Sequence, residues 1–274
     1  MRTNVTRDLK QRMAAGERLY TVLLGPGNDP FPTVEALKKM GFDFIMVDRE
    51  HDLVNPETIY EYVKAGKALD VPIVVRPEEN DADWRCMLDS GVTGLMLSMT
   101  DTVEEVARAV DRAYYPPLGH RGYGLGMCPY QLDGLDPNVV PHLEMMRYLN
   151  DNLMLLPQTE TVKSVSNLRK ILSLEGVTGT AVGTFDLALD IGGASEGMTR
   201  VELTRSEAVE KALFEMGRIC QEMGKVAGIG GIPPEDMARM DKAGYKLFIF
   251  GTVTEGNMDG VRVALEKTKE LIGV

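Results

Sequence analysis

The chain has 274 residues, of which 44% are hydrophobic and 26% charged, as in a globular protein with a large core. Its net charge of −11, without any cluster of Lys and Arg, argues against nucleic acid as a partner. No apolar run approaches the ~20 residues of a membrane span, and the N-terminus lacks the apolar stretch of a signal peptide. Three widely spaced cysteines fit a reducing compartment, so we expect a cytoplasmic protein that does not contact a membrane.

Short apolar runs alternate with helical patterns along the chain. After a short polar helix within 1–19, the predicted strands are 19–25, 42–47, 71–75, 94–99, 153–157, 180–183, 226–229 and 246–250. The predicted helices between and after them are 32–40, 55–69, 81–90, 102–115, 139–150, one that ends at 175–176, 206–223, 233–243 and 259–272. Two irregular segments, 118–137 and the Gly-containing loop after 192, interrupt this alternation, and long loops are often functional.

Eight strand–helix units without a linker predict one domain, residues 1–274, folded as an α/β protein of the (β/α)₈ TIM-barrel class. An open, doubly wound sheet is the alternative. It would need roughly six strands and a Gly-rich first turn. The sequence Gly25-Pro26-Gly27 at the first turn does not have that pattern, so the barrel is favoured.

Two carboxylates stand near the ends of neighbouring predicted strands, Glu160 after the fifth and Asp186 after the sixth. The carboxyl ends of barrel strands carry the active site, so these side chains should share one edge. Three interpretations are open: a general acid/base pair, a divalent metal site, or simple caps of the following helices. With Gln158 close by and no second His or Cys near the pair, oxygen donors favour Mg²⁺ or Mn²⁺ over zinc.

Two further side chains follow predicted strands two and three. The imidazole of His51 could accept or return a proton, although a lone His is more often structural. Arg76 suits a carboxylate or an enolate oxygen, and an ion pair with Asp48 or Glu50 is equally compatible with its position. A metal, a base and an arginine around a small oxyacid predict proton removal or C–C cleavage next to a carbonyl.

A series of motifs covers most of the chain. They are Asp48-x-Glu50-His51, Val74-Val75-Arg76-Pro77, Leu88-Asp89-x-Gly91, Tyr115-Pro116-Pro117-x-Gly119-x-Arg121-Gly122, Gln158-x-Glu160-Thr161 and Gly183-x-x-Asp186-Leu187. Through them the chain resembles the metal-dependent class II pyruvate aldolases of the HpcH/HpaI aldolase and citrate lyase β superfamily. The resemblance implies a carbon–carbon lyase that reversibly cleaves a 4-hydroxy-2-oxo acid to pyruvate, or a similar 2-oxo acid, and an aldehyde.

The same resemblance implies roles for individual residues. Glu160 and Asp186 would hold the divalent metal, Mg or Mn with Co as a further option, and no organic cofactor is expected. His51 and Asp89 would form an acid/base dyad acting through metal-bound water, and Arg76 would bind the keto or enolate oxygen. The residues expected to contact the substrate are Gln158, Gly183, Thr184, Arg121 and Arg49. A homo-oligomer is also implied, a hexamer or trimer of dimers that exchanges the C-terminal helix between subunits.

The chain departs from the family pattern at several positions. Arg49 stands where a small residue is usual, where it would narrow the site or add an anion contact, and Thr184 stands where proline is usual. The segment 123–130 does not match the family's segment on the aldehyde side. The aldehyde therefore stays open, and so do two alternatives: another enolate reaction, such as citrate-type condensation or decarboxylation, and a non-catalytic metabolite-binding oligomer.

Overall fold

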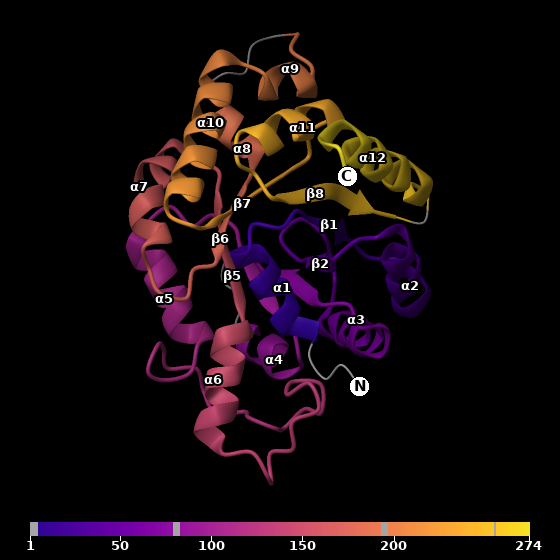
Figure 1. Ribbon diagram of the computed structural model, residues 1–274, viewed down its shortest axis with the longest axis vertical. Helices are drawn as coiled ribbons and strands as arrows, with labels where there is room; N and C mark the ends of the chain where they lie inside the picture. The colour runs from indigo at the N-terminus through magenta and orange to yellow at the C-terminus, as the bar shows by residue number, and fades with distance from the viewer. Residues whose placement is uncertain (1–4, 79–82, 193–196, 255) are drawn as a thin grey trace.

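The computed structural model describes residues 5–78, 83–192, 197–254 and 256–274. Eight parallel strands form a closed barrel in chain order, and the last strand pairs with the first (Figure 1). The strands are β1 (Leu19–Leu24), β2 (Phe44–Asp48), β3 (Ile73–Arg76), β4 (Gly94–Leu97), β5 (Met154–Thr159), β6 (Gly179–Val182), β7 (Val226–Gly230) and β8 (Leu247–Val253). The predicted TIM barrel is confirmed.

Helices surround the barrel. They are α1 (Val5–Ala14), α2 (Pro30–Met40), α3 (Pro56–Leu69), α4 (Trp84–Asp89), α5 (Val103–Ala113), α6 (His142–Asn152), α7 (Val162–Leu172), α8 (Thr184–Asp190), α9 (Arg200–Thr204), α10 (Glu207–Glu222), α11 (Pro234–Lys242) and α12 (Met258–Ile272). The best-predicted helix is α3, because the Asn55 side chain accepts a hydrogen bond from the Thr58 amide and Pro56 follows at the first helical position. The sequence did not predict α8 and α9. No helix in the described ranges is long and apolar enough to span a membrane.

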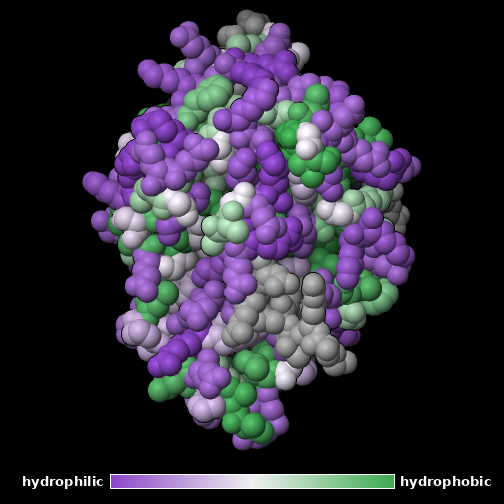
Figure 2. Space-filling model, in the orientation of Figure 1, coloured by the Kyte–Doolittle hydropathy of each residue, from purple (hydrophilic) through white to green (hydrophobic). Residues whose placement is uncertain are grey.

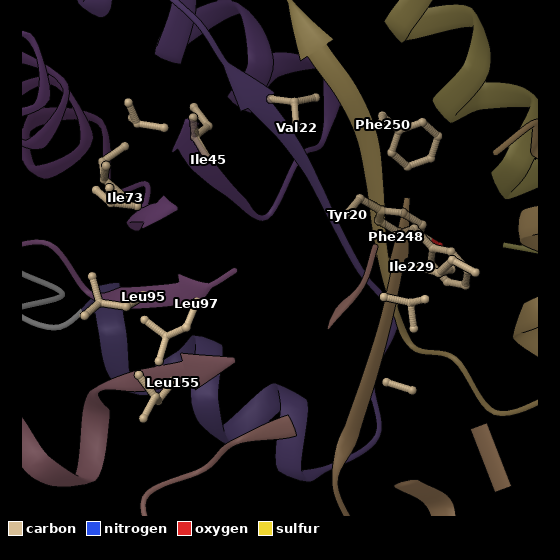
Figure 3. Close-up of a cluster of buried hydrophobic side chains, with 14 of the residues drawn as sticks. Tyr20, Val22, Ile45, Ile73, Leu95, Leu97, Leu155, Ile229, Phe248 and Phe250 are labelled. Atoms are coloured by element: carbon tan, nitrogen blue, oxygen red, sulfur yellow. The ribbon is translucent and has the colours of Figure 1, made fainter. Parts of the chain in front are cut away.

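Alternating strand residues divide the core into two layers. The inner layer fills the barrel and includes Phe44, Met46, Val74, Met96, Met154, Leu156 and Leu247. The outer layer lies between the strands and the helices and includes Tyr20, Val22, Ile45, Ile73, Leu95, Ile229 and Phe248 (Figure 3). Each fully buried side chain of this size contributes roughly 1.5–3 kcal/mol.

The helix α1 closes one end of the barrel. Its Leu9 and Met13 are buried in the inner layer together with Leu19 and Phe44, which are the first residues of β1 and β2. Figure 1 shows α1 lying across the strands in this view. Among the described residues, α1 therefore covers the amino ends of the strands at the centre of the barrel.

The irregular segment 118–137 is packed rather than free. Its Leu125 and Leu132 form a separate buried cluster with Tyr115 and Met145 of α6. Exposed apolar side chains, such as Met127, lie on the same part of the chain, and Figure 2 shows hydrophobic residues gathered at that end of the molecule.

The C-terminal helix α12 packs on its own chain. It contacts α11 and β8, and its Val261, Leu265 and Thr268 are buried. The predicted exchange of this helix concerns an assembly of several copies and stays a prediction.

Candidate active site

A cavity of about 680 Å³ opens at the carboxyl ends of the strands. Each of the eight strands contributes at least one residue to its wall, from Leu23 of β1 to Ile249 of β8. The helices α8 and α9 add residues beyond the end of β6. The cavity therefore lies at the end of the barrel where the sequence predicts the site.

Glu160 follows β5 directly and is 1% exposed. Its carboxylate accepts a hydrogen bond from the Met99 amide at 2.6 Å and another from the Gln158 side chain. The N-cap of α7 is Thr161, whose hydroxyl accepts from the Ser164 amide at 3.0 Å. The helix-cap interpretation of Glu160 is therefore wrong, because the cap is the next residue and the carboxylate points elsewhere.

Burial raises the pKa of Glu160 above the ordinary carboxyl value. The negative charges of Glu50 and Asp186 add to this shift, while the donors from Met99 and Gln158 oppose it. A buried carboxylate that faces two further acids is unfavourable by itself. A positive charge placed beside it would relieve both the repulsion and the desolvation.

Asp186 lies in the first turn of α8 and not at the end of a strand, because α8 begins immediately after Gly183. A carboxylate in a first helical turn interacts favourably with the helix dipole, so a structural contribution is also present. The side chain lines the cavity. Gly183 leaves the space that the Glu160 and Gln158 side chains occupy, since a Cβ there would lie 2.4 Å from Glu160 Oε2 and 2.8 Å from Gln158 Nε2.

Whether these residues fit a divalent metal is decided by their donor atoms. In the described part of the chain, no group of three or more His, Cys, Asp or Glu side chains converges on one point. Magnesium and manganese, however, need only one or two protein carboxylates and complete their shell with water and substrate oxygens. Glu160, Asp186 and the Gln158 amide oxygen offer this kind of set, so the residues fit a hard divalent cation.

Arg76 is 7% exposed and is held as a rigid fork. Its Nε and Nη2 donate to the two Asp48 oxygens at 2.8 and 2.5 Å, and Nη1 lies 2.9 Å from Glu50 Oε2. The ion-pair interpretation is therefore confirmed. Because a guanidinium has five N–H groups, these three contacts leave up to two for a ligand, and Arg76 also lines the cavity.

His51 stands at the edge of the cavity, and its side chain is 63% exposed. Its Nε2 lies 3.5 Å from Glu50 Oε2. The predicted partner Asp89 instead accepts hydrogen bonds from Arg121 at 2.6 Å and Gln131 at 2.9 Å. Within the described residues of one chain, the structure does not bring His51 and Asp89 together.

The physical reason is the direction of α4. A helix that follows a barrel strand runs back toward the amino ends of the strands, and Asp89 is the last residue of α4, just before β4. Arg121 is placed beside Asp89, with Thr93 and Leu153, which directly precede β4 and β5. The expectation that Arg121 contacts substrate is thus not met by the cavity of its own chain.

Arg49 also points away from the cavity. Its Nε donates to the Val54 carbonyl at 3.0 Å, and its Nη2 lies 3.6 Å from Glu78. Successive residues of a strand point to opposite sides, so Asp48 faces the cavity and Arg49 does not. Among the predicted contacts, Gln158, Gly183 and Thr184 do line the cavity.

Two residues of the cavity wall were not predicted from the sequence, Phe185 of α8 and Arg200 of α9. The Arg200 guanidinium lies over the Phe185 ring, 4.0 Å from its centroid. A signal for α9 was present in the sequence, because Thr199 and Glu202 have the spacing of a capping box, which the structure contains.

A sequence model of the HpcH/HpaI aldolase/citrate lyase family matches residues 21–219. A 2-keto-3-deoxy-L-rhamnonate aldolase of Shigella dysenteriae is 28% identical over 240 residues, which are 87% of this chain and 84% of that protein. A 4-hydroxy-2-oxo-heptane-1,7-dioate aldolase of Salmonella heidelberg is 32% identical over 221 residues, which are 80% of this chain and 78% of that protein. The crystal structure of an HpcH/HpaI aldolase from Desulfitobacterium hafniense is similar with a TM-score of 0.80 at 25% identity, over 96% of both chains.

Proposed function

We propose, since this chain belongs to the HpcH/HpaI aldolase/citrate lyase family, that it is a divalent-metal-dependent aldolase. The reaction is the reversible cleavage of a 4-hydroxy-2-oxo acid to pyruvate, or a similar 2-oxo acid, and an aldehyde. One observation carries the proposal: Arg76, Gln158, Asp186 and His51 line the same cavity, and Glu160 is hydrogen-bonded to Gln158.

Glu160 and Asp186 would hold the cation, with Gln158 orienting Glu160. Mg²⁺ or Mn²⁺ suits these oxygen donors best, and Co²⁺ is a further option. When bound, the cation supplies positive charge that stabilises the negative charge developing on the 2-oxo oxygen. The raised pKa of Glu160 supports this assignment, because a cation removes the repulsion that raises it.

The chain's own residues have separate tasks in the cleavage. His51 accepts the proton of the C4 hydroxyl group at its imidazole, the C3–C4 bond breaks, and C4 leaves as the aldehyde carbon. The electron pair of the broken bond forms the enolate of pyruvate, whose oxygen accepts hydrogen bonds from the free N–H groups of Arg76. The proton that His51 accepted is returned to C3, which yields pyruvate, and the pyruvate carboxylate would lie against the backbone near Gly183 and Thr184.

The position of Asp89 bears on whether the protein forms an oligomer. Because His51 and Asp89 lie at opposite ends of one barrel, the predicted dyad would need Asp89 of the partner subunit. We therefore keep the homo-oligomer, a hexamer or a trimer of dimers, as part of the proposal.

The test is cleavage of 4-hydroxy-2-oxopentanoate by the purified protein, with pyruvate read by mass. EDTA should abolish the activity, and added Mg²⁺ or Mn²⁺ should restore it. His51→Ala should be inactive, whereas His120→Ala, which changes an 85% exposed side chain on the loop after α5, should remain active. Full turnover in EDTA would contradict the proposal.

The alternatives have their own readouts. An assay with oxaloacetate and an acetyl donor detects citrate-type condensation, and carbon dioxide release detects decarboxylation. A non-catalytic metabolite-binding oligomer would be favoured if titration calorimetry found no binding of Mn²⁺ at micromolar concentration.

A further inference from the structure

The wall of the cavity contains a second arginine besides Arg76. Arg200 is the first residue of α9, which lies beyond the end of β6, and its side chain is exposed at the cavity. The two arginines come from different parts of the barrel, β3 and α9, so one of them can serve the 2-oxo acid while the other serves a different part of the substrate.

Arg200 rests on a fixed aromatic platform. Its guanidinium carbon lies 4.0 Å from the centroid of the Phe185 ring, which is close enough for a cation–π contact. The Phe185 ring is itself packed against Gly231, where a Cβ would lie 2.8 Å from the Phe185 Cε2 atom. Gly231 also has a φ of +72°, so the backbone there favours glycine, and the glycine leaves the room that the ring occupies.

The charges around the two arginines differ. Arg76 is neutralised by Asp48 and Glu50. Arg200, in contrast, forms no ion pair or hydrogen bond with any acid in the ranges that the structure describes. Stacking on a ring leaves the N–H groups at the edge of a guanidinium free, and this fork matches the two oxygens of a carboxylate.

Position decides which carboxylate it would bind. The 2-oxo acid half belongs with Arg76, Gln158 and Gly183, which lie on or next to β3, β5 and β6. A cavity of about 680 Å³ is large enough for a further molecule beside pyruvate. An exposed arginine from α9, which lies outside these strands, is available to a part of the substrate that extends beyond the 2-oxo acid half.

We propose that Arg200 is a specificity-determining residue that binds a carboxylate at the far end of the aldehyde. The preferred acceptor is then an aldehyde acid, and the molecule cleaved is a 4-hydroxy-2-oxo acid with a second carboxylate. This inference rests on the proposed aldolase function and deepens it. The cavity wall also carries the acids Asp52 and Asp186, which would repel an anionic acceptor that Arg200 did not bind.

The first experiment measures acceptor preference. With pyruvate and Mg²⁺, kcat/KM is determined for succinic semialdehyde and for butanal, which has the same four-carbon chain without the carboxylate. The unaltered protein should prefer succinic semialdehyde. Arg200→Met should lower the ratio of the two constants by about tenfold, which is a typical value for one charged contact that is partly exposed. Arg200→Lys should lie between, because lysine keeps the charge and loses the fork.

The second experiment is a binding measurement that does not need turnover. Butyrate and butyramide are titrated calorimetrically into the protein with Mg²⁺ and oxalate present. Butyrate should bind more tightly, and Arg200→Met should remove most of that difference. Arg218→Met changes an exposed arginine of α10 outside the cavity wall and should leave both experiments unchanged.

Exchange of the pyruvate C3 protons in D₂O separates the two levels of the proposal, because it needs no aldehyde. If the unaltered protein exchanges these protons but Arg200→Met does not change the acceptor ratio, the assignment of Arg200 is overturned while the aldolase proposal stands. If exchange is absent but butyrate binding depends on Arg200, the aldolase proposal fails while the carboxylate site stands. Butyrate binding that is equal in Arg200→Met overturns the site in either case.

Discussion

The two ends of this barrel differ in how far their acids are neutralised, because at the carboxyl end Arg76 pairs with Asp48 and Glu50 but not with Glu160. At the amino end, acids are paired with bases: both oxygens of Asp241 accept from Arg18 at 2.7 and 2.8 Å, and Asp43 accepts from Arg12 at 2.6 Å. At the carboxyl end, the buried Glu160 is hydrogen-bonded to Gln158 of the cavity wall, and the negative charges of Glu50 and Asp186 act on it.

The pKa shifts of two carboxyl groups express this difference. Burial by itself would raise the pKa of Asp241, but the donors Arg18 and Lys246 outweigh it, and the pKa lies below its ordinary value. Burial raises the pKa of Glu160, and the neighbouring acids raise it further. The amino end thus satisfies its charges within the chain, whereas the carboxyl end leaves a deficit of positive charge that suits a bound cation.

The largest expected effect comes from removing the negative charge of Glu160. Glu160→Gln keeps the shape of the side chain and removes its negative charge, so kcat/KM for cleavage should fall by about 10³-fold or more, because a cation ligand is lost. The metal-free variant should melt at a higher temperature than the metal-free parent, because an unfavourable buried charge is gone.

The pH dependence of melting checks the cause. Because the pKa of Glu160 is raised in the folded state, the folded chain binds more protons than the unfolded chain between the ordinary and the raised value. The stability of the metal-free parent should therefore fall as pH rises through that window, and Glu160→Gln should lack this part of the fall. A variant that melts lower than the parent at neutral pH would contradict the comparison.

A smaller loss of activity is expected when Arg76 is changed. Its guanidinium is held in one orientation by two hydrogen bonds to Asp48. Arg76→Lys keeps the charge but cannot contact Asp48 and Glu50 in the same geometry, so kcat/KM should fall by about 10²-fold. The loss should appear in pyruvate proton exchange as well as in cleavage, since Arg76 is assigned to the enolate oxygen. Unchanged exchange would remove that assignment. Arg239→Lys, on the exposed side of α11, is the matched control.

The sequence predicted the barrel because its signal is redundant. Eight apolar runs, each followed by a helix or a loop, predict the same fold even if one strand boundary is wrong by two residues. The residues at the carboxyl ends of the strands were predicted for the same reason, since the residue after each strand is known once the strand is found. Glu160, Arg76 and His51 were located in this way, and the cavity wall includes or adjoins all three.

Two kinds of information were not in the pattern. The helices α8 and α9 have seven and five residues, which is too few to display a helical period, so Phe185 and Arg200 were missed. Side-chain direction was also hidden, because Arg49 follows a cavity residue in the chain but points the other way. The order of the motifs along the chain, finally, does not show that Asp89 and Arg121 lie at the amino end of the barrel. That position follows from where α4 ends.

The smallest effect on chemistry should come from the amino end. Met13→Ala removes a side chain of α1 that is 3% exposed at the bottom of the barrel, and we expect the free energy of unfolding to fall by about 2 kcal/mol. Urea denaturation measures this loss, and Gln11→Ala, on the exposed face of the same helix, should change it little. Both variants should keep the parent's kcat/KM, because the inner apolar layer separates α1 from the cavity. If Met13→Ala lowered kcat/KM as strongly as Arg76→Lys, the two ends would be coupled through that layer, and stability and chemistry could not be assigned to opposite ends of the barrel.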